Sequence, residues 1–278
     1  CKTVVIDAVR QGGTAVINAD DERCLEGAQW ARGDIVYFTM DPDSRPVYRH
    51  VREHGVAFTV ADEHIVMRQG HVQAQVIPVA DAPITFEGHA RFNIANALAA
   101  AAAAYGLGLN LADIQMGLQT FHPSPGQNPG RTNLIEADGV KVLIDYGHNV
   151  PALEALNDLV SNLSARRRIC VASAPGNRRD EDIVALGRQL AKMHDTLFVC
   201  ETHPRGRELG EAAGLVRSGA EADGSCPTEI VMGEEDAVER ALDEAQEGDL
   251  LVLLVDDLEG ATHKVKSRSF RTAVLSGG

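Results

Sequence analysis

The sequence predicts an α/β protein in two parts, the second of which is a Rossmann-like, mostly parallel sheet. Strand and helix patterns alternate from residue 140 to residue 255, which is typical of a parallel sheet with helices on both faces. Short apolar runs separated by polar turns fill residues 34–77 instead. They indicate a smaller mixed or antiparallel sheet.

A proline-rich segment separates the two parts. Residues 122–126 read HPSPG, and two prolines beside a glycine favour an extended, non-helical connection. We therefore place a domain boundary here and expect domains at residues 1–122 and 123–278.

The composition limits the kind of protein. A chain of 278 residues with 44% hydrophobic and 24% charged residues can bury a sizeable core. Its net charge of −14 argues against binding to nucleic acid or to an anionic membrane. The five cysteines show no CxxC spacing, so we expect reduced thiols rather than a disulfide framework. With no signal-peptide pattern and no membrane-spanning apolar run, we expect a cytoplasmic protein.

The first part is expected to begin with a helix and a strand. Apolar residues follow a helical period over Lys2–Arg10, and Gly12-Gly13 ends this helix before the strand Ala15–Asn18. Asp20-Asp21 then reads as a turn and helix cap rather than a metal pair. Further strands are expected at Asp34–Thr39, Val56–Val60, His64–Arg68, Val72–Ile77 and Ile84–Phe86, and helices at Pro46–Glu53, from within Gly88–Ala97 to Tyr105, and at Leu111–Phe121.

Two histidines in this part have a spacing that metal ligands use on helices. His50 and His54 are four residues apart, but no third ligand is evident. We therefore interpret them as surface histidines.

The second part is expected to open with a β-hairpin. Thr132–Glu136 and Val140–Ile144 flank Asp138-Gly139, a pair that favours a two-residue turn. Pro151 then suits the first turn of a helix. The elements expected after it are the helices Pro151–Leu163, Asp180–Met193, Arg207–Arg217 and Glu234–Gln246, and the strands Arg168–Ala172, Thr196–Cys200, Glu229–Met232 and Leu250–Val255.

Polar clusters follow several of these strands at their carboxyl ends. They are Asp145–Asn149, Ser173–Asp182 and Glu201–Arg207, with Asp256-Asp257 after the last strand. Because the carboxyl ends of parallel strands share one edge of a sheet, we expect the clusters to converge on a ligand site, at which the last pair could hold a cationic group. The alternative is that the two basic loops are simply solvated.

Arg131 and Asp145 are the first candidates for this site. Pro129-Gly130 leaves Arg131 on a short loop, and Asp145 ends a strand. A carboxylate in that position can bind ribose hydroxyls, and a nearby arginine can hold phosphate. The two side chains can equally form a surface ion pair, so from these residues alone both readings stay open.

The same residues resemble the Mur ligase superfamily. Gly130-Arg131, followed by Asp145–Asn149 (DYGHN), resembles the GR…DYAHN pattern at the start of its C-terminal domain, with Gly147 in place of Ala. The segment Gly88–Ala97 resembles the HNxxNxxAA signature, with Phe92 in place of the frequent His.

The resemblance covers nearly the whole chain. The order lysine, helix, glycine, strand and NADD over residues 2–21 resembles the family's central, ATP-binding domain. Within the superfamily, Gln127–Arg131 and Ser173–Ile183 look most like the cyanophycin synthetases. The resemblance therefore implies the remainder of a Mur ligase central domain, followed by the Rossmann-like C-terminal domain.

The resemblance also implies roles for particular residues. Arg131 would neutralise phosphate in catalysis, and Lys2 would help to position Mg²⁺ if it is carbamoylated. Asn93, Asp145, His148 and Asn149 would join Arg131 in binding the nucleotide, although Asn93 read alone is a helix cap. The candidates for binding the incoming substrate are Arg178, Asp180, His203 and Arg205.

The implied reaction is ADP-forming amide synthesis. The complete enzyme would use ATP and Mg²⁺ to join an amino acid such as arginine to an aspartate side chain through an acyl phosphate. The phosphate loop G-x-x-x-x-G-K-[ST] is absent from these 278 residues, as is an ATP-grasp half. We therefore expect this chain to be part of a larger ligase and not to turn over ATP alone.

Two alternatives remain open at this point. The chain could be a fragment of a peptidoglycan Mur ligase, or a non-catalytic binding module that retains the fold. Its expected partners are ATP and an amino-acid or peptide substrate, with no nucleic acid and no membrane. The sequence leaves the oligomeric state open, and a homo-oligomer is compatible with it.

Overall fold

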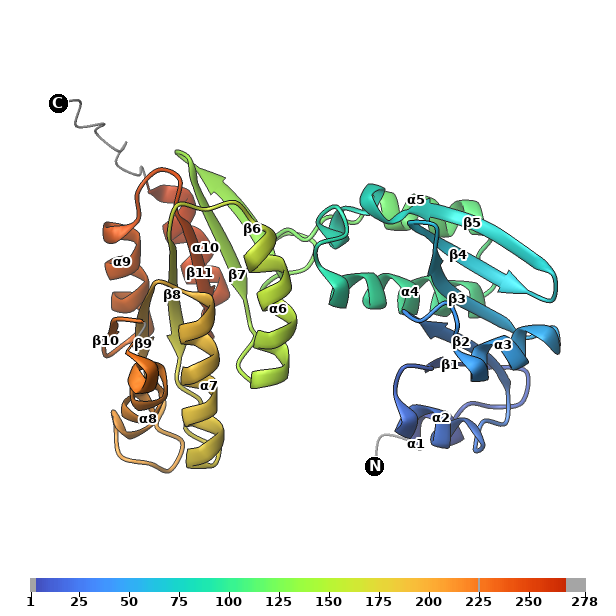
Figure 1. Ribbon diagram of the computed structural model, residues 1–278, viewed down its shortest axis with the longest axis horizontal. Helices are drawn as coiled ribbons and strands as arrows, with labels where there is room; N and C mark the ends of the chain where they lie inside the picture. Colours follow the sequence, from blue (N-terminus) through green and yellow to red (C-terminus); the bar gives the residue numbers. More distant parts are fainter. Residues whose placement is uncertain (1–3, 225, 269–278) are drawn as a thin grey trace. The chain divides into compact units, whose positions relative to one another are not determined.

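The computed structural model describes residues 4–224 and 226–268, so Lys2 lies outside the described residues. The chain forms two compact units, Cys1–His122 and Pro123–Gly278. In Figure 1 the first unit runs from blue to green and the second from green to red. Within the described residues, no helix has both the length and the apolar character needed to cross a membrane.

The first unit contains one mixed five-stranded sheet. Its first three strands pair in parallel, and the last two add to it antiparallel, which confirms the expectation of a mixed sheet. The order is that of the chain: β1 (Thr14–Asn18), β2 (Asp34–Thr39), β3 (Val56–Ala61), β4 (His64–Gln69) and β5 (Val72–Pro78).

Helices cover both faces of this sheet. On one face, alanines and Leu98 of the long helix α4 pack with the next helix against buried residues such as Phe58 and Ile65. On the other face, residues such as Ala28, Val47 and Val51 pack on Ala15, Ile17 and Ala57. The helices are α1 (Val4–Asp7), α2 (Glu22–Ala28), α3 (Arg45–Arg52), α4 (Arg91–Gly106) and α5 (Leu111–Thr120).

One expectation for this unit is confirmed and two need correction. The helix cap expected at Asp20-Asp21 is confirmed, since Asp21 caps α2. The edge strand expected at Ile84–Phe86 is wrong, because Pro83–Thr85 forms a 3₁₀ turn in which the Thr85 hydroxyl donates to the carbonyl of Val79 at 2.7 Å. His50 is half-buried rather than a surface residue, with Nε2 3.1 Å from the carbonyl of Ile35.

The second unit contains a six-stranded sheet in the order β10-β9-β8-β11-β7-β6. Five strands are parallel, and β6 is an antiparallel edge strand joined to β7 by the hairpin turn at Asp138-Gly139. Both turn residues have positive φ, 49° and 75°, as this kind of turn requires. The strands are β6 (Asn133–Ala137), β7 (Val140–Asp145), β8 (Arg168–Ser173), β9 (Thr196–Cys200), β10 (Thr228–Ile230) and β11 (Leu250–Leu254).

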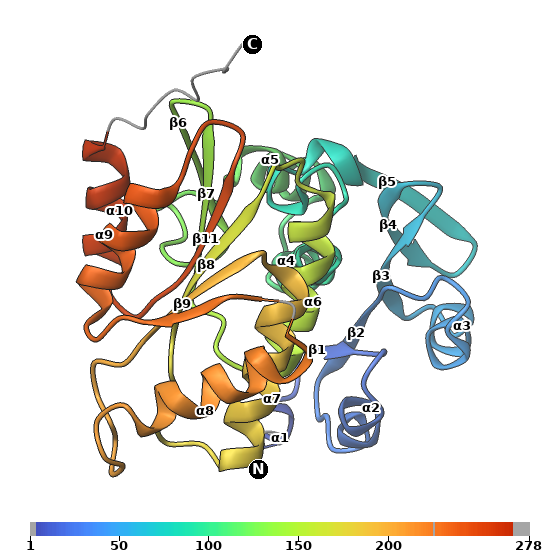
Figure 2. The same ribbon diagram turned by 60° about the vertical axis from the view of Figure 1, so that its left-hand side comes forward.

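The helices of the second unit lie on the two faces of its sheet, α6, α7 and α8 on one and α9 and α10 on the other (Figures 1 and 2). Their bounds are α6 (Val150–Asn162), α7 (Asp180–Met193), α8 (Glu211–Ala220), α9 (Glu234–Glu244) and α10 (Leu258–Ser267). The expected α/β fold with a mostly parallel sheet is confirmed. Two details differ, since α8 begins at Glu211 rather than Arg207, and α10 was not expected.

The core of the second unit explains why its strands read as continuous apolar runs. All five residues of β11 are buried, because side chains alternate between two helix-covered faces. Val142, Val171 and Leu253 pack with α9 and α10 in one cluster, and their neighbours Leu143, Cys170 and Val252 are equally buried.

His194, at the end of α7, gives this unit a pH-dependent stability. The residue is 5% exposed, and its Nδ1 lies 2.9 Å from the carbonyl of Leu190. Burial lowers the pKa of His194 from 6.5 to about 4. The unfolded chain therefore binds a proton at this residue at a higher pH than the folded chain does, and stability falls as the pH drops from about 7 towards 4.

We expect His194 to remove up to about 3 kcal/mol of folding free energy across that window. Urea denaturation of the wild type and of His194→Gln, at several pH values between 7.5 and 4.5, measures the difference. The variant should show a smaller loss of stability with acidification. His263→Gln, at an exposed position, should retain the wild-type dependence, and equal slopes for all three proteins would contradict the prediction.

Candidate functional site

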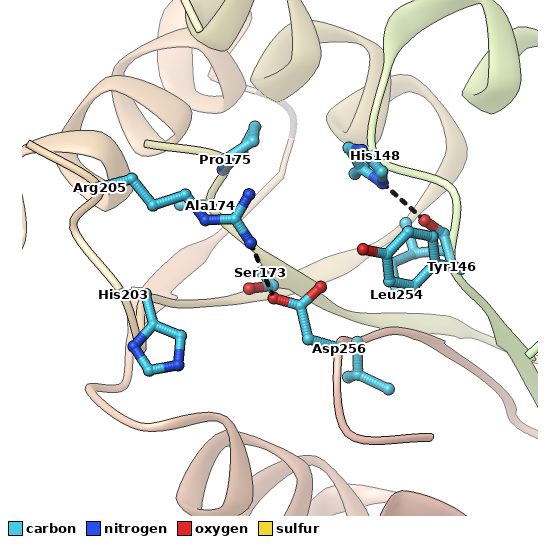
Figure 3. A pocket seen from close by; sticks show the side chains of 10 residues that line it. Tyr146, His148, Ser173, Ala174, Pro175, His203, Arg205, Leu254 and Asp256 are labelled. Atoms are coloured by element: carbon cyan, nitrogen blue, oxygen red, sulfur yellow. Dashed lines mark hydrogen bonds and ion pairs between the residues drawn. The ribbon is translucent and has the colours of Figure 1, made fainter. Parts of the chain in front are cut away.

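A polar pocket lies at the carboxyl edge of the sheet in the second unit. Because β7, β11, β8 and β9 are parallel neighbours, the segments that follow them meet at this edge. The pocket is drawn in Figure 3, and its lining comes from all four segments: Tyr146, His148, Ser173, Ala174, Pro175, His203, Arg205, Leu254, Val255 and Asp256.

The Asp145 carboxylate shapes the loop after β7. Its two oxygens accept hydrogen bonds from the backbone N–H groups of Thr132 at 2.8 Å and Gly147 at 2.7 Å. Burial raises the pKa of Asp145, while these hydrogen bonds and the Arg131 charge act in the opposite direction. Tyr146 and His148 follow, with their rings edge to face at 4.9 Å, and both line the pocket.

Arg131 is exposed beside this loop. Its guanidinium lies over the Tyr146 ring, 5.5 Å from the ring centre, and it forms no ion pair with Asp145 within 4 Å among the described residues. The surface ion pair that the sequence left open is therefore not what the structure shows. Gly130, just before it, has φ +67° and sits against Leu258, where a Cβ would overlap the leucine side chain.

Opposite charges face each other in the pocket. The Arg205 side chain extends towards Asp256 (Figure 3), and their nearest N and O atoms are 3.7 Å apart. Both side chains remain exposed, at 42% and 46%, so this ion pair contributes little by itself. Both charges are therefore accessible to a ligand.

Asp256 is held in place from α9. The buried Glu234 side chain accepts the backbone N–H groups of Asp256 at 2.8 Å and Asp257 at 2.6 Å. Burial raises the pKa of Glu234. The backbone around Asp256 is thus fixed by a carboxylate that lies outside the pocket.

The structure brings some of the predicted site residues together and separates others. His148, His203 and Arg205 line one pocket. Asn149 caps α6 by accepting the N–H of Ala152 at 3.0 Å, and Asp180 pairs with Arg207 at 2.7 Å. The exposed Arg178 does not line the pocket.

Asn93 belongs to the first unit and is not an N-cap. Ala90 occupies that position, whereas Asn93 is 4% exposed and donates from Nδ2 to the carbonyl of Ile84 at 2.9 Å. Its Oδ1 accepts from Asn96 at 3.1 Å. Its proposed contact with a nucleotide stays a prediction.

From the sequence, Tyr146 and Ser173 received no individual role, although both belong to the polar clusters at the strand ends, and that position was the available signal. Asp256 was expected to hold a cationic group, and it lines the pocket. The proposed Mg²⁺ role falls on Lys2, outside the described residues, and residues 4–224 and 226–268 contain no cluster of three or more His, Cys, Asp or Glu able to hold a metal.

Comparison with known proteins agrees with this architecture. Residues 130–254 match the family described as Mur ligase, glutamate ligase domain. The chain is 35% identical over 270 residues to a cyanophycin synthetase of Crocosphaera subtropica, covering 96% of this chain and 31% of that protein. It is 28% identical over 263 residues to a UDP-N-acetylmuramyl-tripeptide synthetase of Deinococcus radiodurans, covering 91% of this chain and 50% of that protein.

Solved structures share the fold at low sequence identity. MurF from Acinetobacter baumannii superposes with a TM-score of 0.66 at 18% identity, over 96% of this chain and 55% of that chain. These solved structures share the α/β fold of this chain. Residues 130–254 belong to the Mur ligase, glutamate ligase domain family, and almost the whole chain is similar to cyanophycin synthetases.

Gly130 provides a test of how the loop that carries Arg131 is held. In Gly130→Ala, the added Cβ meets Leu258 and the residue must keep a left-handed φ, so we expect a loss of about 2 kcal/mol and a melting temperature lower by several degrees. Gly126→Ala is the matched control, because nothing lies within 4 Å of its Cβ position. Calorimetric melting of both variants measures the effect, and equal melting temperatures would contradict this account.

Proposed function

We propose that the pocket of the second unit binds the incoming amino acid of an ATP-dependent, ADP-forming amide ligase. The observation that carries the proposal is the pairing of Arg205 with Asp256 in a strand-end pocket, in a chain similar to cyanophycin synthetases over 96% of its length. The chain spans 31% of the length of that relative, so the activity of the whole ligase is part of the proposal.

The ligand that suits this pocket carries both signs of charge. Arg205 offers a fork of donors for an α-carboxylate, and Asp256 offers two acceptor oxygens for a guanidinium. A ligand that supplies both partners can replace the loose 3.7 Å contact between the two side chains. Arginine meets this requirement, and we propose arginine or a similar cationic amino acid as the substrate.

The proposed reaction has two steps. An acceptor carboxylate, such as an aspartate side chain, attacks the γ-phosphorus of ATP to give an acyl phosphate and ADP. The amino group of the incoming amino acid then attacks the acyl carbon, and it loses a proton as phosphate leaves. The protein's contribution is to position the two reactants and to neutralise charge.

The loop after β7 is proposed to face the nucleotide. Arg131 has an exposed guanidinium suited to phosphate, and His148 presents a ring in the pocket. Asp145 and Asn149 already accept backbone N–H groups, so we propose that they mainly shape the loop. Asn93 of the first unit is a further proposed nucleotide contact, and Lys2 the proposed support for Mg²⁺.

Calorimetric titration of the purified chain with L-arginine tests the amino-acid site. We expect the wild type to bind L-arginine and Asp256→Asn to bind it at least tenfold more weakly, because the guanidinium loses a charged partner worth about 1.4 kcal/mol. L-Citrulline, which has the shape of arginine without its charge, should bind the wild type weakly. Arg205→Gln should weaken L-arginine and L-citrulline alike, because both carry the α-carboxylate.

Glu208→Gln is the matched control, since Glu208 is an exposed carboxylate of the same loop as Arg205 that does not line the pocket. It should bind L-arginine as the wild type does. Binding of 2,6-diaminopimelate in preference to L-arginine would favour the peptidoglycan ligase reading, because that compound appears in the name of a relative 28% identical to this chain. Binding of neither would contradict the proposed amino-acid site.

A further inference from the structure

We propose that Arg207 is a positioning residue that fastens the loop after β8 to the loop after β9 and so holds Arg205 at the pocket. The inference rests on the proposed function only in taking the pocket as a ligand site. No motif in the sequence singled out Arg207 among the arginines of these loops.

Arg207 joins the two loops through main-chain carbonyls. Its Nε donates to the carbonyl of Gly176 at 2.9 Å, and its Nη2 donates to the carbonyl of Arg178 at 2.7 Å. Gly176 and Arg178 follow β8, whereas Arg207 follows β9. One guanidinium therefore fixes the course of a loop that lies about thirty residues earlier in the chain.

The same guanidinium also contacts the first residues of two helices. Nη2 pairs with Asp180 of α7 at 2.7 Å, and Nη1 pairs with Glu211 of α8 at 2.6 Å. The Arg207 side chain is only 17% exposed. All three guanidinium nitrogens of Arg207 donate hydrogen bonds within the protein. Arg205 is more exposed, and its guanidinium remains accessible to a ligand.

Close backbone packing accompanies these hydrogen bonds. Gly176 lies against the carbonyl of Pro204, where a Cβ would overlap the oxygen. The next residues turn sharply, since Arg205 has φ +50° and Gly206 has φ +98°. A non-glycine residue in this region is strained by about 1 kcal/mol or more and persists only when its surroundings impose it.

These observations identify what imposes the conformation of Arg205. Before the turn, the carbonyl of Pro204 packs against Gly176. After the turn, Arg207 donates a hydrogen bond to the carbonyl of Gly176. Arg205 stands between the two contacts, directed towards Asp256 (Figure 3). Because the lysine side chain has a single nitrogen, it cannot reproduce the forked hydrogen bonds of the Arg207 guanidinium.

Hydrogen exchange of the full chain, read by mass spectrometry, tests the inference without requiring any activity. In Arg207→Ala we expect peptides covering residues 173–179 and 201–210 to exchange at least tenfold faster, while β8 and β9 keep wild-type protection. Arg207→Lys should resemble Arg207→Ala, because the fork and not the charge makes the contacts. Arg179→Ala is the control, since Arg179 is 72% exposed and pairs with Glu181 and Asp182 in the first turn of its own helix.

A second measurement separates positioning from general damage. We expect Arg207→Ala to bind L-arginine at least tenfold more weakly than the wild type, with a melting temperature within a few degrees of it. Loop exchange at the wild-type rate, full rescue by Arg207→Lys, or equal acceleration in β8 and β9 would each overturn the inference. If the wild type does not bind L-arginine, the proposed function fails, while hydrogen exchange still decides the role of Arg207.

Discussion

Carboxylates that accept backbone N–H groups position the loops at the carboxyl edge of the second sheet. Asp145 holds the loop after β7, Glu234 holds the segment after β11, and Glu201, after β9, accepts the N–H of Ala213 in α8 at 3.0 Å. Glu201 and Glu234 are buried. Burying a carboxylate is unfavourable unless hydrogen bonds satisfy it. Both oxygens of Asp145 and of Glu234 accept N–H groups, so these two residues tie their segments to a defined geometry. Glu201 accepts through Oε2 alone, and its buried Oε1 has no hydrogen-bond partner among the described residues.

The loop after β8 is held by a cationic side chain, Arg207, rather than by a carboxylate. Arg207 donates to the backbone carbonyls of Gly176 and Arg178. In the other segments, the carboxylates accept hydrogen bonds from backbone N–H groups instead. The four segments around the pocket are therefore fixed by side chains that do not line it. Arg205 and Asp256, which line the pocket, are left accessible to solvent and ligand.

Much of the second unit could be predicted from the sequence, because its strands are buried on both faces. Such strands are continuous apolar runs, as in β11, and their alternation with amphipathic helices specifies a parallel sheet. The parallel sheet in turn predicts that polar strand ends meet, and His148, His203 and Arg205 do line one pocket. In the first unit, the local signal failed at Ile84–Phe86, where the Thr85 hydroxyl bonds to main-chain carbonyls and stabilises a turn instead of a strand.

The supports of the site could not be predicted in the same way, because they join residues that are distant in the sequence. Glu234 bonds to Asp256 across 22 positions and Arg207 to Gly176 across 31, and neither pair leaves a local pattern. Motifs identified Asp145 and Asn149 but not what they do here, since both accept backbone N–H groups. In this unit, residues prominent in motifs shape a loop, whereas Arg205 and Asp256, from two different strand ends, supply the accessible charges. A sequence motif at such an edge thus specifies where the loops go, and the chemistry of the pocket follows from which exposed side chains those loops bring together.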